Sequence, residues 1–552
     1  MLQFKLDIFQ LFAQEENMAE TNLMRGTKIL TAATLASKIL GFIYVVPFSA
    51  LVGQTGLGLY SYGYTPYTIL LSLATLGFPL AVSKFVSKYQ SMGDYETGYR
   101  LFKSGLIVMS ITGFIAFLLL FFMAPFITPL VLPDEKAGVN SYEDIIFTIR
   151  MVSVALLIVP IMGMIRGYFQ GCQQMMPTAV SQVIEQIVRI SFILAAAFLI
   201  MNVYDGNIGL AVGFATFGAF VGGLAGLAVL LYYLFKNRQN MLGMATSNKS
   251  SKPLPLKAMY KELIWYAIPL SIVGLAIPLF QLVDTMTING ALASIGMGEV
   301  SENFVGVLTQ SAHKIVLIPM ALATALSVTL VPTITKAYTE GDYSQLQRLI
   351  TQTFQLILFI TLPAAIGLAV LSDPIFVALF SVDDLAIGGE TLRYYGPITL
   401  LFSLFSVTAA ILQGINRQML AITALVVGLA LKLALNHFLL VQMGPNGAIL
   451  ATYIGFIVAI AITLWGIGTY TSFSYKQIVR RGAYLLVFSM IMAGAVWIID
   501  KGLSMTFPLE NRFNSFVLTG VGAVSGAIVY AYLTYRTRLA EIVLGARFKR
   551  PD

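Results

Sequence analysis

The stretch SQVIEQIVRISFILAAAFLI (residues 181–200) is long and apolar enough to cross a bilayer as one helix, yet it carries Glu185 and Arg189 near its middle. A charge at the centre of a membrane helix costs about 2.5–3.5 kcal/mol on insertion scales. The two residues are four apart and share a helical face with Gln182, so the helix has one polar stripe. The pair either locks helices together as a satisfied ion pair or lines a polar path through the membrane.

The rest of the chain is equally apolar. It has 552 residues, of which 57% are hydrophobic and 11% charged, and its mean hydropathy is +0.82. Soluble domains are about 25% charged. We therefore expect an all-α polytopic membrane protein with about 14 transmembrane helices and a functional site between them. The predicted spans are residues 29–52, 58–83, 104–126, 145–168, 178–201, 208–235, 261–288, 304–332, 348–371, 391–412, 419–441, 447–470, 482–500 and 513–535.

Composition excludes several classes of site. The single Cys172 rules out an internal disulfide, and two histidines without an HExxH motif argue against a zinc-type metal site. The dipeptide Gly-Lys never occurs, so the chain has no phosphate-binding loop and no ATPase of its own. We expect no metal and no cofactor. Residues 1–24 lack the pattern of a signal peptide, and Met18 is an alternative start.

Basic residues gather in alternate loops, which predicts the orientation in the membrane. The basic loops are residues 84–103, 236–257, 336–348 and 476–481, together with the tail 536–550, whereas the loops between them are acidic. This pattern places both termini and the 236–260 loop in the cytoplasm. The net charge of +8 follows from the same pattern. Nucleic-acid binding is the alternative explanation of that charge, and we expect no nucleic-acid partner.

The sequence repeats itself at long range. VSKYQSMGDYETGYRLF (86–102) resembles ITKAYTEGDYSQLQRLI (334–350), and FQGCQQMMPTAVSQVIEQIVRI (169–190) resembles LQGINRQMLAITALVVGLALKL (412–433). The second match aligns Arg189 with Lys432. Because the repeated loops lie on the same predicted side, the repeat is parallel: two six-helix lobes related by a pseudo-twofold axis along the membrane normal, with two C-terminal helices added. Chance similarity between apolar segments is the alternative.

This repeat divides the chain into five parts. They are an N-terminal cytoplasmic extension (1–24), an N-terminal lobe with spans 1–6 (25–235), a cytoplasmic linker (236–260), a C-terminal lobe with spans 7–12 (261–471), and spans 13–14 with a basic cytoplasmic tail (472–552).

We expect six charged residues to be buried in the membrane, whereas Arg166 lies nearer the cytoplasmic end of its span. The cations are Lys38, Arg189, Lys314 and Lys432, and the acids, which are candidates for coupling to a cation, are Glu185 and Asp284. Like charges between helices repel one another unless an anion joins them, so the excess of cations predicts a binding site for phosphate or pyrophosphate. The repeat aligns Glu185 with Gly428, so Lys432 has no acid four residues before it on its own helix. Snorkelling of its side chain to the membrane interface is its alternative role.

Seven blocks of sequence carry a resemblance to a known family. They are MRGTKIL (24–30), SKILGF (37–42), GFPLAVSKFVSKYQSMGDYET (77–97), IRMVSVALLIVPIMGMIRGYFQG (149–171), PTAVSQVIEQIVR (177–189), VGLAIPLFQLVDT (273–285) and AAILQGINRQ (409–418). The chain resembles the lipid II flippases of the MurJ/MviN type, Gram-positive branch, in the multidrug/oligosaccharidyl-lipid/polysaccharide exporter superfamily. The resemblance runs from about Arg25 to the C-terminus.

The resemblance implies two six-helix lobes around a cationic central cavity. It also implies that undecaprenyl-pyrophosphate-linked peptidoglycan precursor is flipped from the inner to the outer leaflet by alternating access. The family's cavity cations match Lys38, before Leu-Gly-Phe, and Lys314, five residues before Pro319. Both are lysines rather than the arginines of Gram-negative members, so bidentate geometry is lost. The Arg-Asp pair that follows Leu-Gly-Phe in that branch is also missing, and Glu185 and Arg189 are candidates to replace it.

Such a protein is not an enzyme, and we expect it in the bacterial cell membrane. Its expected partners are a lipid-linked oligosaccharide substrate, membrane lipids, a coupling cation or the membrane potential, and cell-wall synthesis proteins. The nearest rival function is export of a teichoic-acid, capsule or sporulation glycolipid. A cation-coupled multidrug exporter would favour an acidic cavity. A glycosyltransferase would need a metal-binding acidic motif, and a cell-division scaffold would need no buried cations.

Overall fold

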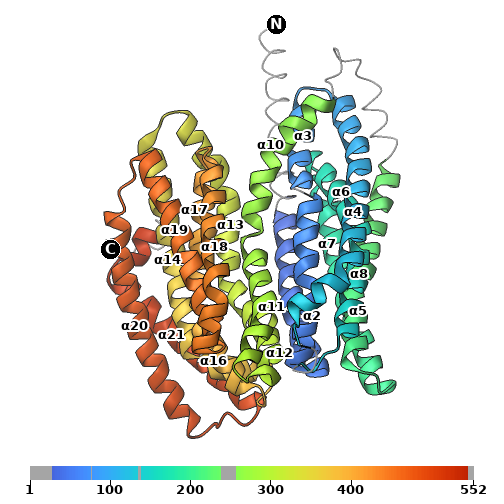
Figure 1. Ribbon diagram of the computed structural model, residues 1–552. Helices are drawn as coiled ribbons and strands as arrows, with labels where there is room; N and C mark the ends of the chain where they lie inside the picture. The colour runs from blue at the N-terminus through green and yellow to red at the C-terminus, as the bar shows by residue number, and fades with distance from the viewer. Residues whose placement is uncertain (1–25, 27, 76, 135–137, 238–255, 545–552) are drawn as a thin grey trace. The chain divides into compact units, whose positions relative to one another are not determined.

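The computed structural model describes residues 26, 28–75, 77–134, 138–237 and 256–544 (Figure 1). Within these ranges every regular element is a helix, which confirms the predicted all-α class. The N-terminal extension 1–24 with Met18, most of the predicted linker 236–260 and the end of the basic tail lie outside the described residues.

The number of membrane spans agrees approximately with the prediction. Among the described residues, twelve helices are long and apolar enough to cross a membrane, and the bent pair Met259–Gly274 and Ala276–Ser294, with a 48° break, makes up to thirteen. One of the twelve is the 64-residue run Lys28–Ser91. At about 1.5 Å per residue this run is roughly three times as long as the hydrocarbon core is thick, so it contains more than one crossing. Its backbone leaves the helical region at Gly53 (φ 68°) and Gly77 (φ 64°).

The described chain forms two compact units. Unit 1 comprises residues up to Tyr44, Pro66–Ala124 and Phe147–Ser271; unit 2 comprises Val45–Thr65, Pro125–Ile146 and the chain from Ile272 onward. Unit 2 is therefore not built from the second half of the sequence alone. Two segments of the first half, 45–65 and 125–146, pack within it.

Unit 1 is a helical bundle in which α3 packs on α6 and α7 packs on α8. Its core is formed by side chains such as Val82, Leu101, Met164 and Phe169. Its helices, some of which continue into unit 2, are α2 (Val45–Thr75), α3 (Phe78–Ser91), α4 (Tyr95–Val131), α5 (Tyr142–Ser153), η2 (Val154–Leu157), α6 (Val159–Gly171), α7 (Met175–Phe198), η3 (Leu199–Val203), α8 (Ile208–Lys236) and α10 (Leu256–Gly274).

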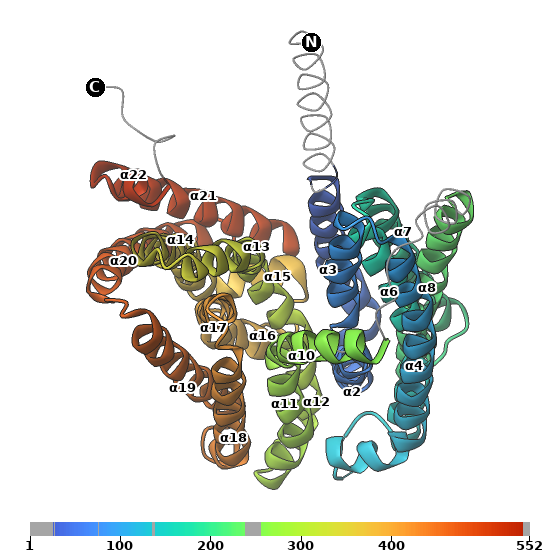
Figure 2. The same ribbon diagram turned by 90° about the horizontal axis from the view of Figure 1, so that it is seen from above.

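Unit 2 packs α18 on α19, α13 on α17 and α14 on α20. The two C-terminal spans belong to it, because α20 and α21 pack on each other and α21 also packs on α15 (Figure 2). Its remaining helices are α11 (Ala276–Ser294), α12 (Gly298–Gly306), η4 (Val307–Ser311), α13 (Ala312–Thr339), α14 (Tyr343–Val370), α15 (Ser372–Leu379), α16 (Leu385–Tyr395), α17 (Ile398–Gly414), α18 (Gln418–Met443), α19 (Asn446–Thr471), α20 (Lys476–Ser504), α21 (Arg512–Arg536) and α22 (Leu539–Leu544).

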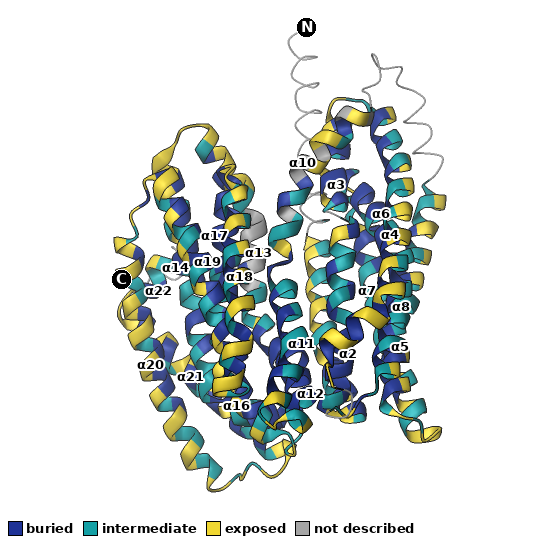
Figure 3. Cartoon of the chain, in the orientation of Figure 1, coloured by how far each residue is buried: buried dark blue, intermediate teal, exposed yellow. Residues whose placement is uncertain are grey.

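Large apolar side chains lie on the outside of the helices as well as inside. Along α20, the side chains of Met490, Trp497 and Ile498 are more than half exposed (Figure 3). An apolar surface of this extent is costly in water and costs little in lipid. The chain is therefore a multi-pass membrane protein.

The internal repeat is present in the backbone. Gly93 and Gly341 both have positive φ, 75° and 72°. The aspartate after each glycine, Asp94 or Asp342, accepts a hydrogen bond from the backbone N–H three residues on, at 3.0 and 2.9 Å. Both aspartates therefore stabilise the start of a helix. The two turns of the repeat therefore share one structural role.

The second pair of repeated segments, 169–190 and 412–433, also shares one backbone turn. Gln173 and Asn416, which the repeat aligns, both adopt the left-handed conformation, with φ of 59° and 58°. The backbone N–H of the next residue, Gln174 or Arg417, donates to the carbonyl oxygen five residues earlier, at 2.9 and 2.7 Å. Identical turns at aligned positions argue that the sequence similarity is not accidental.

Candidate functional site

The charges of the opening stretch form a triad in unit 1. Glu185 accepts from Arg189 Nη2 at 2.7 Å on one carboxylate oxygen and from Arg166 Nη2 at 2.9 Å on the other. The three side chains are between 12% and 16% exposed. Arg166 on α6 was not among the predicted site residues, although its charge within an apolar run was a signal that could have identified it.

Two glycines on α8 allow this helix to pack closely against α7, which carries Glu185 and Arg189. A Cβ on Gly222 would lie 2.7 Å from the Glu185 carbonyl oxygen, and one on Gly226 would lie 3.2 Å from Glu185 Cβ. Small residues four apart allow two membrane helices to approach through their backbones. Ser181 completes the arrangement, because it accepts from Arg166 Nη2 at 2.6 Å and donates to the Gly226 carbonyl at 3.0 Å.

Lys38 lies on a helix that packs against the same face of α7. Thr34 Oγ1 donates to Gln182 Oε1 at 3.2 Å, and a Cβ on Gly41 would lie 3.2 Å from Gln186 Nε2. Positions 34, 38 and 41 share one helical face, so Lys38 sits between these two contacts. Its side chain is exposed. The structure therefore brings Lys38, Glu185 and Arg189 to one region of unit 1.

This region is cationic. The triad carries a net charge of +1, and Lys38 adds a second positive charge. Two guanidinium groups next to one carboxylate can bind a further anion, since an arginine has five N–H donors in a fixed fork and a carboxylate does not occupy all of them. An incoming phosphate would compete with Glu185 for these donors.

Lys432 and Asp284 form a different, fully buried pair in unit 2. Lys432 Nζ lies 2.8 Å from Asp284 Oδ2, and the lysine side chain has no exposed surface. Lys432 also donates to Thr452 Oγ1, and its ammonium lies 5.5 Å from the centre of the Phe280 ring. Asn436 donates to both Asp284 Oδ1 (3.3 Å) and Thr287 Oγ1 (2.6 Å).

The acid that neutralises Lys432 therefore comes from α11 rather than from its own helix. In this arrangement the ammonium does not snorkel to the interface and is not accessible to a substrate. The partners Asn436, Thr287 and Thr452 were not predicted, because nothing in the sequence shows which helices will be neighbours.

Replacing Lys432 by methionine is expected to destabilise the protein by about 3–5 kcal/mol, since Asp284 would remain buried without its counter-charge. The double variant Asp284→Asn/Lys432→Met should regain most of that loss. Thermal unfolding of the purified proteins would test this. A single Lys432→Met variant as stable as the wild type would show that the pair does not hold α11 to α18.

Lys314 lies in a third place, on α13 of unit 2, and is half-buried. Its neighbour His313 is buried, and His313 Nδ1 lies 3.1 Å from Tyr395 Oη. The turn before α13 is the π-helical segment η4. Insertions of this kind interrupt the regular helix and are frequent at functional sites.

Segment 45–65 contacts this π-helical turn through polar side chains. Ser61 Oγ lies 2.6 Å from Thr309 Oγ1 and accepts from Gln310 Nε2 at 2.9 Å, while Ser311 donates to Gln54 Oε1 at 2.6 Å. All five side chains are buried. Segment 45–65 is thus fixed to η4 by hydrogen bonds that have no water to compete with them.

The other first-half segment of unit 2 is held by Glu302 of α12. This carboxylate is 1% exposed and accepts from the backbone N–H of Val139 at 2.6 Å and of Asn140 at 3.1 Å, as well as from Asn140 Nδ2 at 3.0 Å. Three donors compensate the burial of the acid.

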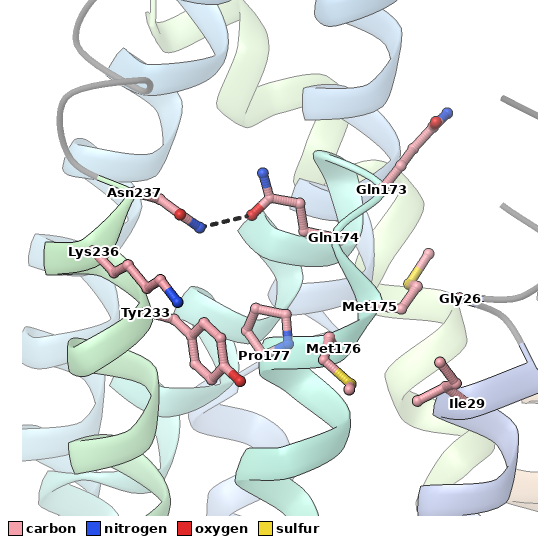
Figure 4. Close-up of a pocket in the computed structure, with 10 residues that line it drawn as sticks. All are labelled: Gly26, Ile29, Gln173, Gln174, Met175, Met176, Pro177, Tyr233, Lys236 and Asn237. Carbon is pink, nitrogen blue, oxygen red and sulfur yellow. Dashed lines mark hydrogen bonds between the residues drawn. The ribbon is translucent and has the colours of Figure 1, made fainter. Parts of the chain in front are cut away.

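A cavity of about 380 Å³ lies at the end of unit 1, between the start of the first helix, the turn that leads into α7, and the end of α8 (Figure 4). Its lining consists of Gly26, Ile29, Gln173, Gln174, Met175, Met176, Pro177, Tyr233, Lys236 and Asn237. Asn237 donates to Gln174 across it at 3.2 Å. None of the predicted site residues lines this cavity, so it is separate from the triad.

Comparison with known proteins agrees with the resemblance in the sequence. The family model described as "Polysaccharide biosynthesis protein" matches residues 23–338. "Lipid II flippase MurJ" of Bacillus subtilis (strain 168) is 44% identical over 96% of this chain and 97% of its own. "Stage V sporulation protein B" of the same strain is 25% identical over 80% and 82%.

A solved structure shows the same fold. "Lipid II flippase MurJ, inward closed conformation" matches 92% of this chain and 99% of its own with a TM-score of 0.62, at 16% identity. Identity of 44% along nearly the whole chain, together with this fold and the family model, shows that the chain belongs to the MurJ family of polysaccharide biosynthesis proteins.

Proposed function

We propose that this chain translocates lipid II, the undecaprenyl-pyrophosphate-linked peptidoglycan precursor, from the inner to the outer leaflet of the bacterial cell membrane. The observation that carries the proposal is the 44% identity, over 96% of the chain, to a relative named as a lipid II flippase. Translocation makes and breaks no covalent bond, so the proposed activity is transport and not catalysis.

The physical task explains why a cationic site is needed. A headgroup of sugars, peptide and two phosphates cannot cross apolar lipid, because its polar groups would lose their water without gaining other partners. Lys38 and the Arg166–Glu185–Arg189 triad supply such partners for phosphate. We assign Lys38, Arg189 and Lys314 to substrate binding. Lys432 is assigned to the support of unit 2 in the described state, since its side chain is completely buried.

We infer that transport proceeds by alternating access and that the membrane potential biases it. Moving one elementary charge through the potential changes the free energy by about 2.3 kcal/mol per 100 mV. Both acids that were candidates for cation coupling, Glu185 and Asp284, are already paired with basic side chains. This pairing favours the potential over a soluble cation as the driving force. The basic loops support an orientation with both termini in the cytoplasm.

Export of another lipid-linked glycan is the nearest alternative. It is supported by the sporulation relative, whose identity of 25% is far below 44%. A multidrug exporter for cationic drugs would be served by an acidic site. Glu185 and Asp284 are instead paired with basic side chains, and the triad keeps a positive charge.

Lys38→Ala and Lys314→Ala are each expected to abolish translocation while the protein still inserts into the membrane. The reason is the loss of a cation that the proposal assigns to the pyrophosphate. Complementation of a strain depleted of its own lipid II flippase would test this, with Lys336→Ala as control, since the Lys336 side chain is 74% exposed at a helix end. Normal growth with both variants at wild-type protein level would contradict the assignment.

A further inference from the structure

Unit 2 contains a second cavity, which the transport proposal does not use. It measures about 520 Å³ and lies between the first turns of α14 and α20, with Ile542 of α22 at its edge. Its polar lining consists of three cations, four glutamines and three hydroxyl side chains. The basic-loop pattern predicts that this end of α14 and α20 faces the cytoplasm.

The chemistry of the cavity is that of an anion site. Its cations are Arg348, Lys476 and Arg481, and no acidic residue is among the described residues that line it. No described salt bridge neutralises these three cations; the nearby acid Asp342 caps α14 by accepting from Gln345 N–H. Two helix N-termini also point their positive ends toward this place.

One cation is held in position. When the Gln477 amide is oriented with its oxygen toward the guanidinium of Arg481, this oxygen accepts from Nη2 at 2.7 Å and from Nη1 at 3.3 Å. A guanidinium fixed in this way can present its other N–H groups to a ligand at a lower cost in side-chain entropy.

Gln355 supplies an independent indication of a ligand. It lines the cavity and is only 2% exposed, yet its Nε2 has no hydrogen-bond partner. A buried amide donor without an acceptor costs about 1–3 kcal/mol, so buried donors are normally satisfied. An anion in the cavity would provide the missing acceptor.

The surroundings favour an anionic lipid over a soluble anion. The cavity opens at the end of two membrane spans, and apolar side chains that could lie along acyl chains stand next to it. Val479 on α20 is 68% exposed and Ile542 on α22 is 49% exposed. Basic pockets between spans at a cytoplasmic surface suit phospholipid headgroups.

We propose that Arg348, Lys476, Arg481 and Gln355 bind the phosphate of an anionic membrane phospholipid and so anchor α14 to α20 at the membrane surface. This site is distinct from the substrate triad of unit 1, and its occupancy does not depend on the proposed transport of lipid II.

Binding of lipids to the purified full-length chain tests this directly, without any flipping assay. Native mass spectrometry would count dioleoylphosphatidylglycerol or dioleoylphosphatidylcholine retained by the detergent-solubilised protein. The variant is Arg348→Gln/Arg481→Gln. The control is Arg100→Gln/Lys103→Gln, which removes the same charge near the aligned turn of the repeat, where Arg100 matches Arg348.

Phosphatidylglycerol is expected to bind the wild type and the control equally. It should bind the Arg348/Arg481 variant about 30-fold more weakly, since each basic residue near the surface contributes about 1 kcal/mol. Gln355→Leu should weaken binding about tenfold, through loss of one hydrogen bond to a charged group. This second variant keeps the test decisive if the double variant does not fold.

Three results would overturn the proposal. They are equal binding of phosphatidylglycerol to wild type and all variants, equal retention of phosphatidylcholine and phosphatidylglycerol, and binding of glycerol 1-phosphate as tight as that of phosphatidylglycerol. The last of these would assign the site to a soluble phosphate.

Discussion

The double variant Glu185→Gln/Arg189→Gln is expected to fold and reach the membrane but to lose translocation by at least about tenfold, since charge-assisted hydrogen bonds contribute about 1.5–3 kcal/mol each. Both replacements are neutral, and the amide oxygen that replaces the Glu185 carboxylate could still accept from Arg166, so the packing of α6, α7 and α8 should survive. The net charge of the triad stays at +1. A loss of transport would therefore report on the Arg189 guanidinium and not on overall charge.

The matched control replaces Arg166 in place of Arg189. Arg166→Gln/Glu185→Gln also leaves a net charge of +1 but retains Arg189. Because Arg166 is bonded to Ser181 as well as to Glu185, we assign it to positioning the acid, and we expect this variant to keep measurable transport. Transfer of lipid II by the purified variants in liposomes would decide. Wild-type transport by Glu185→Gln/Arg189→Gln would leave the triad as a structural lock only.

A disulfide between positions 61 and 309 is expected to stop transport reversibly. The Oγ atoms of Ser61 and Thr309 lie 2.6 Å apart, which is close to the sulfur–sulfur distance of about 2.05 Å. The Ser61→Cys/Thr309→Cys pair, in a Cys172→Ser background, should therefore oxidise readily. Segment 45–65 packs in unit 2, whereas the chain on either side of it belongs to unit 1. Because α2 continues from this segment into unit 1, we propose that the segment leaves η4 when units 1 and 2 reorient during alternating access, and the crosslink would block that step.

The control crosslink uses two helices that lie wholly in unit 2. Thr408 Oγ1 and Thr463 Oγ1 are 3.0 Å apart on α17 and α19. A Thr408→Cys/Thr463→Cys disulfide should form without effect on transport. Lipid II transfer would be measured before and after dithiothreitol. Full transport by the oxidised 61–309 protein would show that this contact persists through the whole cycle.

The sequence allowed prediction of those features that depend on residues close together along the chain. The spans follow from runs of apolar residues, the Glu185–Arg189 pair from a spacing of four on a helix, and the Asp94 and Asp342 turns from their repeat. The ion pair and both turns appear in the structure, and the number of spans among the described residues agrees approximately with the prediction.

Contacts between helices were not predictable in the same way. Lys432 meets Asp284 across 148 residues, and Arg166 reaches Glu185 from the preceding helix. Helices that are apolar on all sides give no periodic signal of which neighbour they will contact, so the partner of a buried charge cannot be read from spacing. For the same reason, the sequence does not show that segments 45–65 and 125–146 of the first half pack within unit 2. This placement depends on packing around Glu302 and η4, and not on local sequence.

The most direct measurement of the central claim uses the purified chain in liposomes with labelled lipid II in one leaflet. The label that becomes accessible on the opposite side would be followed in time, with and without an imposed membrane potential. We predict transfer that requires the protein, accelerates with the potential and falls to background in Glu185→Gln/Arg189→Gln. A folded wild-type protein that leaves lipid II in its original leaflet, while it transfers a different lipid-linked glycan, would contradict the account.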